Sequence, residues 1–275
     1  MIRRTLGNTV IHLYLAALAL ISTLPMLLVF INSFKKHTDI VSNPLGISFS
    51  AGFQNYIKAW QDIHFSRAFL NSLIYSGSTI VIVLVCATLA AYVFAKKNLK
   101  GSTIILLYFL ITMTIPVQLF LFPLYSFYAK LNLIGNLVAV SFILAALNLP
   151  LSILLLRAFF LQVPQELEEA AMIDGANIAQ MLSKIVIPLV SPGLLTVSVI
   201  VGLNSWNEFL VTSTFIQGEE NFTATLALFS FKGVNYANQG FNMAASMILV
   251  VPAIVFFLAV QRYFIEGIVG GAVKG

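Results

Sequence analysis

Six long apolar runs in this 275-residue chain limit the folds open to it. They lie at about residues 10 to 31, 70 to 95, 104 to 128, 133 to 156, 185 to 213 and 243 to 262. A helix that crosses the roughly 30 Å hydrocarbon core of a bilayer needs about 20 apolar residues, because each residue adds 1.5 Å. The sequence therefore predicts six transmembrane helices.

The composition agrees with a location in the membrane. Hydrophobic residues make up 59% of the chain and charged residues 9%, whereas soluble domains have about 25% charged residues. We expect an all-α membrane protein folded as one transmembrane domain over residues 1–275. The first run follows Arg3 and Arg4, is longer than a signal-peptide core and precedes no evident cleavage site, so we expect a retained helix.

Several functional classes find no support in the sequence. The 15 Lys and Arg are scattered and form no basic stripe for nucleic acid. Cys86 is the only cysteine, and His12, His37 and His64 lack metal-ligand spacing. A phosphate-binding loop of the form G-x-x-x-x-G-K-[ST] is missing, as is any nucleophile-and-base or metal cluster. We expect no enzyme activity, metal or cofactor in this chain.

The distribution of Lys and Arg predicts the orientation. An even number of spans places both termini on one side, and the side with more Lys and Arg is usually cytoplasmic. Nine of the 15 basic residues share the side of the termini, and six lie on the other. The nine are Arg3, Arg4, Lys96, Lys97, Lys100, Arg157, Lys184, Arg262 and Lys274; the six are Lys35, Lys36, Lys58, Arg67, Lys130 and Lys232. We therefore expect cytoplasmic termini and a cytoplasmic segment at 157–184.

That segment contains three glutamates, at 166, 168 and 169, and predicts an elbow. Pro164 suits a first helical turn, and acidic side chains there complement the helix dipole. Gly175 suits the left-handed residue after a helix end. Asn177 is a candidate cap for a second helix that runs on, as a rigid connection, into the fifth span.

The short helix of this elbow has features of a protein-binding segment. Ala170 and Ala171 leave part of it without bulk, so that a partner's backbone could approach closely. A helix lying on lipid headgroups would favour Lys and Arg on its polar face, whereas this one carries Glu. A protein partner is therefore favoured. Glu166 and Glu168 either meet basic residues of that partner or face solvent, and a solvated face is the commoner case.

The elbow resembles the EAA motif of membrane-spanning subunits of ABC importers, which reads E-A-A, three residues, G, nine residues, I-x-L-P. Glu169, Ala170, Ala171, Gly175, Ile185 and Pro188 match it, and Ile187 replaces the usual Leu. The resemblance implies that this segment couples to an ATP-hydrolysing subunit. By that resemblance the coupling residues are Glu169, Ala170, Ala171, Asp174, Gly175, Ile185 and Pro188.

Further stretches resemble the maltose-type permease subunits of carbohydrate importers. They are NSFK at 32–35, FLNSLIYS at 69–76, WNEF at 206–209 and the terminal GGAVKG. The resemblance implies a six-helix permease fold with a cytoplasmic coupling helix, and a C-terminal tail, 263–275, that can reach toward the ATPase dimer. It also implies that Ile185 to Pro188 transmit motion to the spans.

The same resemblance implies an assembly in a bacterial inner membrane. The expected partners are a second homologous permease, a dimer of ATPase subunits that bind ATP and Mg, an extracytoplasmic sugar-binding protein and membrane lipid. The expected substrate is a mono- or oligosaccharide; a polyol or glycerol phosphate is the alternative. An ion-coupled secondary transporter is disfavoured because residues 101–156 carry a single charge, Lys130.

Polar side chains in the apolar runs are candidates for a substrate path. Asn204, Trp206, Asn207 and Glu208 combine hydrogen-bonding groups with an aromatic ring, as sugar sites do. Helix packing, or a tryptophan anchor at the membrane interface, explains these residues at least as well. Gln118 and Asn148 are further candidates to line a cavity.

Prolines interrupt most of the apolar runs. Because proline removes a helix hydrogen bond, each one predicts a bend. They are Pro25, Pro116, Pro150, Pro188, Pro192 and Pro252.

Overall fold

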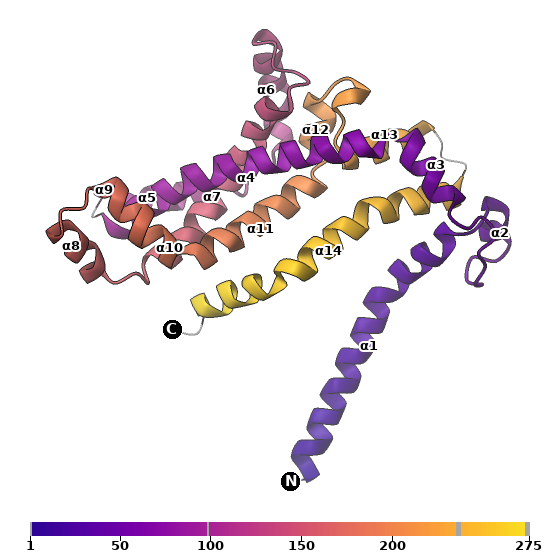
Figure 1. The fold of residues 1–275 in the computed structure, drawn as a ribbon, viewed down its shortest axis with the longest axis horizontal. Helices are drawn as coiled ribbons and strands as arrows, with labels where there is room; N and C mark the ends of the chain where they lie inside the picture. The colour runs from indigo at the N-terminus through magenta and orange to yellow at the C-terminus, as the bar shows by residue number, and fades with distance from the viewer. Residues whose placement is uncertain (1, 98, 235–237, 273–275) are drawn as a thin grey trace. The chain divides into compact units, whose positions relative to one another are not determined.

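The computed structural model describes residues 2–97, 99–234 and 238–272, and the regular elements within these ranges are helical (Figure 1). In chain order they are α1 (Ile2–Ser33), α2 (His37–Ser42), α3 (Gln54–Asp62), α4 (Phe65–Lys96), α5 (Ser102–Thr112), α6 (Gln118–Lys130), α7 (Leu137–Phe160), α8 (Gln165–Ile173), α9 (Ile178–Met181), the π-helix η1 (Leu182–Val186), α10 (Ile187–Leu189), α11 (Ser191–Asn207), α12 (Leu210–Phe215), the 3-10 helix η2 (Glu219–Asn221), α13 (Ala224–Val234) and α14 (Gln239–Ala272).

The chain divides into two compact units. The first combines the residues up to Ser66 with Ala227–Pro252, and the second combines Arg67–Leu226 with the residues from Ala253 onward. The second unit carries the elbow and all the candidate site residues.

The first unit is organised around the NSFK stretch that follows the first apolar run. The Phe34 ring lies 5.1 Å from Tyr56 and 5.4 Å from Phe53 between ring centroids. The side-chain amide of Asn55 donates to the carbonyl oxygens of Ser33 and Lys35, at 2.8 Å and 2.9 Å. Buried polar groups need such partners, so these residues fix the chain where it leaves α1.

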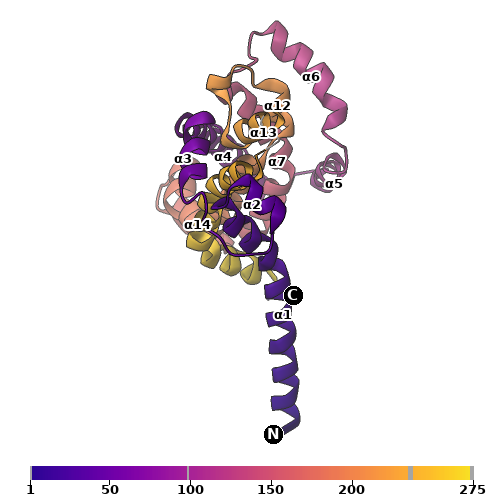
Figure 2. The same cartoon turned by 90° about the vertical axis from the view of Figure 1, so that its right-hand side faces the viewer.

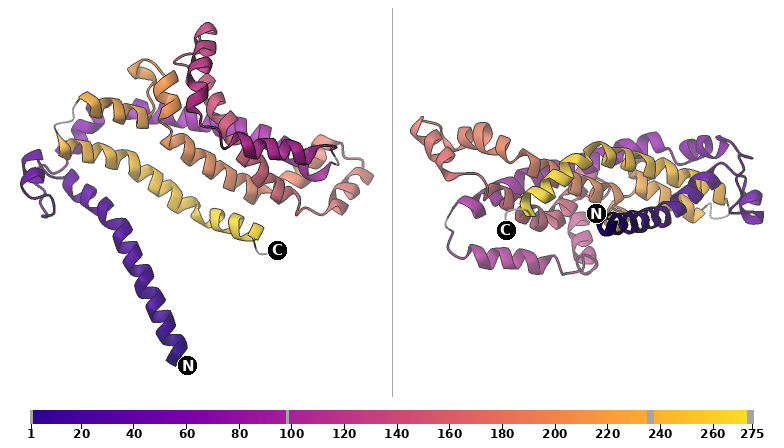
Figure 3. Two further views of the ribbon diagram at one scale, coloured as in Figure 1. Left: turned by 180° about the vertical axis from the view of Figure 1, so that it is seen from behind. Right: turned by 90° about the horizontal axis from the view of Figure 1, so that it is seen from below.

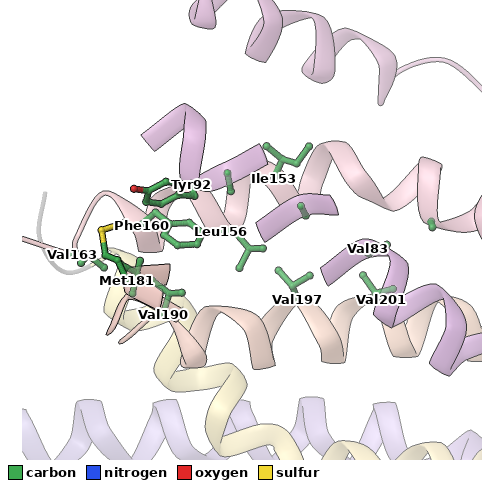
Figure 4. Packing of buried hydrophobic residues seen from close by; sticks show 14 of the residues in the cluster. Val83, Tyr92, Ile153, Leu156, Phe160, Val163, Met181, Val190, Val197 and Val201 are labelled. Atoms are coloured by element: carbon green, nitrogen blue, oxygen red, sulfur yellow. The ribbon is translucent and has the colours of Figure 1, made fainter. Parts of the chain in front are cut away.

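The second unit is built on the packing of α4, α7 and α11. Small residues on α4 let the helices approach closely, as is common between membrane helices. Figure 4 shows the apolar core that results, with side chains from all three helices pointing toward one another. Its buried members include Val83, Ala87 and Ala91 of α4, Ile153, Leu156 and Phe160 of α7, and Val197 and Val201 of α11.

A second apolar cluster lies farther along the same unit. Tyr75 of α4, Tyr128 of α6, Leu144 of α7 and Phe215 of α12 are buried together there. Within this unit, Figure 1 shows α8 to α10 at one end and α6 with α12 toward the other. The elbow and the candidate substrate path therefore lie in different parts of the unit.

Four helices of the described chain are long and apolar enough to cross a membrane, at Ile11–Asn32, Phe65–Lys96, Leu137–Phe160 and Gln239–Ala259. A fifth candidate is a bent pair, Ile178–Leu189 with Ser191–Asn207. These segments correspond to five of the six apolar runs.

The third apolar run differs from the prediction. A single helix was expected over 104–128, but α5 and α6 are separate helices of 11 and 13 residues. Figures 2 and 3 show the angle between them. Pro116 explains the break, because it cannot donate a backbone hydrogen bond and its ring clashes with the preceding turn. Pro25, Pro150 and Pro252, in contrast, lie inside continuous helices.

The sixth run is longer than expected. The predicted span at 243–262 lies within α14, which continues to Ala272 without a break. Most of the expected C-terminal tail, 263–275, is therefore helical in continuity with the span, and residues 273–275 lie outside the described residues.

Candidate functional site

The elbow contains the short helix that the sequence predicts. α8 begins directly after Pro164 and ends before Asp174. Gly175 follows with φ 84°, in the left-handed region that glycine enters without steric cost. Its N–H donates to the carbonyl of Met172, and the next N–H, of Ala176, donates to Ala171. These two bonds close the helix end and turn the chain.

The cap predicted at Asn177 is also present. The Asn177 side chain accepts from the N–H of Gln180 at 2.9 Å, and the Gln180 side chain accepts from the N–H of Asn177 at 3.0 Å. This reciprocal pair is a capping box, which satisfies two free N–H groups at a helix start. It fixes the point at which the chain turns back after the glycine.

The two sides of α8 face different surroundings. Glu168 and Ala171, one helical turn apart, are buried at 5% exposure each. On the opposite side, Glu166, Glu169 and Ala170 are exposed, and Ile173 is 85% exposed. Residues three and four apart share a helix face, so the outer side combines an apolar side chain with carboxylates. This arrangement fits a protein-binding face.

Two expectations about this helix are corrected. Glu168 was expected to be solvated, but it is buried against the end of α4. Ala171 was expected to leave room for a partner, but it packs into the apolar core of its own chain. Ala170 is the alanine that faces outward.

Two groups of the chain contact the Glu168 carboxylate. Lys96 Nζ lies 3.1 Å from Glu168 Oε1, and the two side chains are 10% and 7% exposed. The Tyr92 hydroxyl donates to Glu168 Oε2 at 2.9 Å. Lys96 also donates a hydrogen bond to the carbonyl of Val163, in the link between α7 and α8. The contact with Glu168 Oε1 is an ion pair without the geometry of a hydrogen bond.

The connection from the elbow to the fifth apolar run is not straight. The chain passes through the π-helix Leu182–Val186 and the short α10, and α11 then starts at Ser191. The two parts are bent by 75°. A π-helix accommodates one extra residue per turn, and Pro192 in the first turn of α11 lacks an N–H for the preceding helix. The expectation that the second helix of the elbow continues without a break into the fifth span is therefore wrong.

The fifth apolar run also ends sooner than expected. The predicted span reached residue 213, but α11 ends at Asn207 and a new helix, α12, covers Leu210–Phe215. Glu208 lies in the joint. Its two carboxylate oxygens accept from the N–H groups of Val211 and Thr212 at 2.7 Å and 2.8 Å. The carboxylate thus satisfies free N–H groups at the start of α12.

Two of the candidate path residues meet each other. Asn204 of α11 donates from Nδ2 to Oδ1 of Asn148 on α7 at 3.0 Å, and Asn148 donates to the carbonyl of Leu144 at 2.8 Å. Asn148 is buried, whereas Asn204 is exposed on the surface of this chain. The pair joins α7 to α11 and leaves part of Asn204 accessible.

The remaining candidates lie apart from that pair. The Trp206 ring packs edge to face on Phe69 at 5.4 Å, and its carbonyl accepts from Thr225 Oγ1 at 2.6 Å. Asn207 is exposed and donates to the carbonyl of Leu203 in its own helix. Gln118 is exposed at the first residue of α6, without a hydrogen bond to Asn148 or Asn204.

Sequence reasoning missed three residues in this unit. Lys96 and Tyr92 hold Glu168, and Tyr75 is fully buried with a hydroxyl that has no hydrogen-bond partner among the described residues. Lys96 was predicted to lie on the cytoplasmic side, which is also the predicted side of the elbow. No local pattern indicates which glutamate Lys96 contacts.

Comparisons with known proteins place the chain in a family. Residues 83–269 match the family model described as "Binding-protein-dependent transport system inner membrane component". The chain is 31% identical to the melibiose/raffinose/stachyose import permease protein MelC of Bacillus subtilis, over 99% of both chains. It is 34% identical to the osmoprotective compounds uptake permease protein GgtD of a Synechocystis species, over 96% of this chain and 91% of GgtD.

A solved structure shares the fold. The match is to a chain in the crystal structure of a bacterial ABC transporter involved in the import of the acidic polysaccharide alginate. The TM-score is 0.77 at 22% identity, and the match covers 94% of this chain and 97% of that one.

Proposed function

Because this chain belongs to the family of binding-protein-dependent transport system inner membrane components, we propose that it is one of two membrane-spanning subunits that form the path of an ATP-driven carbohydrate importer. The family consists of transport subunits and not of enzymes. The mono- or oligosaccharide class is supported by the similarity to MelC, whose name specifies melibiose, raffinose and stachyose. The similarity to GgtD favours osmoprotective compounds as the second candidate class.

The proposal assigns ATP hydrolysis to separate subunits in the cytoplasm. Its partners are a second permease, two ATPase subunits that bind ATP and Mg, and a binding protein outside the cytoplasmic membrane. Both termini and the elbow are cytoplasmic in this arrangement, as the distribution of Lys and Arg favours.

The observation that carries the proposal is the outer face of α8. Ile173 is 85% exposed, and the neighbouring Met172 is 52% exposed. Glu166, Glu169 and Asp174 are exposed on the same short segment. An apolar centre with a charged rim is typical of protein interfaces, and the acidic residues favour a partner groove with a basic rim. Glu169, Ala170, Asp174 and Gly175 supply this surface, whereas Ala171 supports it from inside.

Ile185 and Pro188 have a different place in the proposal. Ile185 is half-buried against the apolar core and Pro188 is exposed beside it. They set the start of the bent connection and do not form one stiff rod with α11. The motion of α8 then needs another route into the membrane helices.

For the substrate path, the geometry separates the candidates. Asn204, Asn207 and Gln118 expose amide groups that can bind sugar hydroxyls. Asn148 holds Asn204 in place through their mutual hydrogen bond. The Glu208 carboxylate is engaged by two N–H groups and the Trp206 ring packs on Phe69, which supports a structural role for both.

The test is purification of the tagged chain from its native membrane, followed by identification of bound subunits and uptake of labelled sugars. We expect an ATPase subunit and a second permease to copurify. Cells that lack the chain should lose uptake of at least one sugar among melibiose, raffinose and stachyose, and regain it on complementation. Copurification without sugar uptake, but with uptake of an osmoprotective compound, would favour the second class. If no ATPase subunit binds, the importer assignment fails.

A further inference from the structure

The elbow is joined to the rest of its unit by a buried polar contact as well as by the chain itself. Lys96 is the last residue of α4, and Glu168 lies in the first turn of α8. Their ion pair is nearly closed to solvent, at 10% and 7% exposure of the two side chains. Exposed ion pairs contribute little, but removing one partner of a buried pair leaves an uncompensated charge. The position of α8 therefore depends on both residues.

Each charged group of this pair also has a second partner. Tyr92, one turn before Lys96, donates its hydroxyl to Glu168 Oε2 at 2.9 Å. Lys96 donates to the carbonyl of Val163, so it contacts both α8 and the link that precedes it. A buried polar group that keeps several partners is fixed in direction as well as in position. The end of α4 thus holds α8 at Glu168 and the link before it at Val163.

The end of α7 belongs to the same packed body. Arg157 of α7 donates from Nε to the carbonyl of Phe94 on α4 at 3.2 Å. The Phe160 ring, also on α7, packs edge to face on Tyr92 at 5.8 Å. Figure 4 shows Tyr92, Phe160 and Val163 close together at this end of the core. The last turns of α4 and α7 and the inner face of α8 therefore form one contact region.

The route toward α11 is different. Between α9 and α11 the chain passes through a π-helix and a bend of 75°. Such a break prevents a push along α9 from continuing along the axis of α11. The ion-paired route leads into α4 and α7, whereas the bent route, whose Met181, Val186 and Val190 are buried in the same core, leads into α11.

We propose that Lys96 and Glu168 are positioning residues that lock α8 to the end of α4, so that movement of α8 enters the membrane helices through α4 and α7. This proposal rests on the importer function proposed above. Glu168 then contacts residues of this chain, whereas Glu166 and Glu169 face the ATPase subunit. Tyr92 supports the lock by holding the second carboxylate oxygen.

The test uses charge reversal and its rescue. The variants are Lys96→Glu, Glu168→Lys and the double variant Lys96→Glu with Glu168→Lys. Lys100→Glu is the matched control, because it makes the same charge change as Lys96→Glu at an exposed residue just beyond the end of α4. Each is expressed as the full chain in its native membrane and purified with the subunits that copurify.

The first measurement does not require transport. Hydrogen exchange of the α8 backbone amides is followed by mass spectrometry. We expect both single charge reversals to speed exchange at least tenfold and the double variant to restore at least half of the lost protection on a logarithmic scale. Lys100→Glu should leave exchange within about twofold of wild type. Equal exchange in all variants, or no rescue in the double variant, would overturn the lock.

The second measurement is the ratio of sugar carried to ATP hydrolysed, for whichever of melibiose, raffinose and stachyose the wild-type cells take up. We expect each single reversal to lower this ratio at least tenfold while the ATPase subunit still copurifies, and the double variant to recover it. If a single variant loses ATPase binding as well as the normal ratio, the pair is needed only for folding. That result would contradict the proposed route. A wild-type ratio in either single variant would do the same.

The two proposals fail in different ways. A wild-type chain that binds no ATPase subunit refutes the importer function, while hydrogen exchange still decides whether the pair fixes α8. A wild-type chain that transports normally, with single reversals that also transport normally, refutes the lock and leaves the importer function standing.

Discussion

Nζ of Lys96 lies 3.1 Å from Oε1 of Glu168, across the junction between the longest helix of the unit and the short helix of the elbow. This pair divides the three glutamates of α8 by role. Glu168 stabilises the elbow from inside, whereas Glu166 and Glu169 stay exposed. The cluster of acids in an otherwise charge-poor chain therefore serves two surfaces of one helix.

Replacement of Glu169 by Lys should abolish sugar-stimulated ATP hydrolysis and uptake without loss of membrane insertion. The side chain is exposed, so the exchange costs little folding energy, but it reverses a charge at the proposed interface. Uptake and ATP hydrolysis are measured alongside the amount of chain in the membrane. Full activity in this variant would contradict the coupling role.

Two substitutions at Gly175 separate the backbone conformation of the turn from side-chain bulk at the proposed interface. Space around the glycine is open, so alanine would meet no neighbour, but φ 84° strains any residue with a Cβ. Gly175→Ala should destabilise the elbow by about 1 kcal/mol and lower uptake partly. Gly175→Arg adds bulk at the proposed interface and should abolish uptake. If both variants have the same activity, the turn acts only through its backbone.

Removal of the Trp206 ring should affect stability more than transport. Trp206→Ala removes the contact with Phe69, which we expect to cost on the order of 2 kcal/mol. Thermal unfolding in detergent should occur at lower temperature, with an unchanged apparent KM for sugar. Asn207→Ala is the counterpart, with a changed KM and unchanged stability. An altered KM in Trp206→Ala at wild-type stability would place the ring in the path instead.

The Asn148 to Asn204 hydrogen bond should have a measurable coupling energy. Polar contacts between membrane helices average about 0.6 kcal/mol in double-mutant cycles. A cycle of Asn148→Ala, Asn204→Ala and the double variant, followed by unfolding in a denaturing detergent, should give a value near that average. A coupling energy of zero would mean that the two amides do not hold α7 and α11 together.

Loss of the Glu208 carboxylate should weaken the start of α12. Glu208→Ala removes the acceptor of two N–H groups, and loss of a helix cap costs about 1 kcal/mol. The same unfolding measurement checks this value. Glu208→Asp, which keeps the charge on a shorter side chain, should lose less. Unchanged stability in Glu208→Ala would free the carboxylate for a role in the path.

Local signals in the sequence predicted the elbow well. Pro164, Gly175 and Asn177 act on the backbone within a few residues, so their effects follow from residue type alone. The breaks at Pro116 and Pro192 were marked by proline, but Pro150 lies inside α7, which continues through it without a break. Whether a proline breaks a helix depends on its packing neighbours, which the sequence does not specify.

Contacts between distant residues could not be predicted in this way. Lys96 and Glu168 lie far apart in sequence, and nothing in either segment shows that the two side chains meet. The burial of Ala171 beside the exposed Ala170 depends on which side of α8 faces α4. The helix α8 was predicted correctly, but which of its residues are buried depends on the long-range contact between Lys96 and Glu168.

The most direct test of the account is site-specific photocrosslinking from α8 in the native membrane. A photoreactive amino acid at Ile173, which is 85% exposed, should crosslink to an ATP-hydrolysing subunit. The control is the same amino acid at Phe122 of α6, which is 84% exposed in another part of the same unit and should give no such product. Failure of the Ile173 probe to reach an ATPase subunit, in membranes where the chain is active in uptake, would contradict the account.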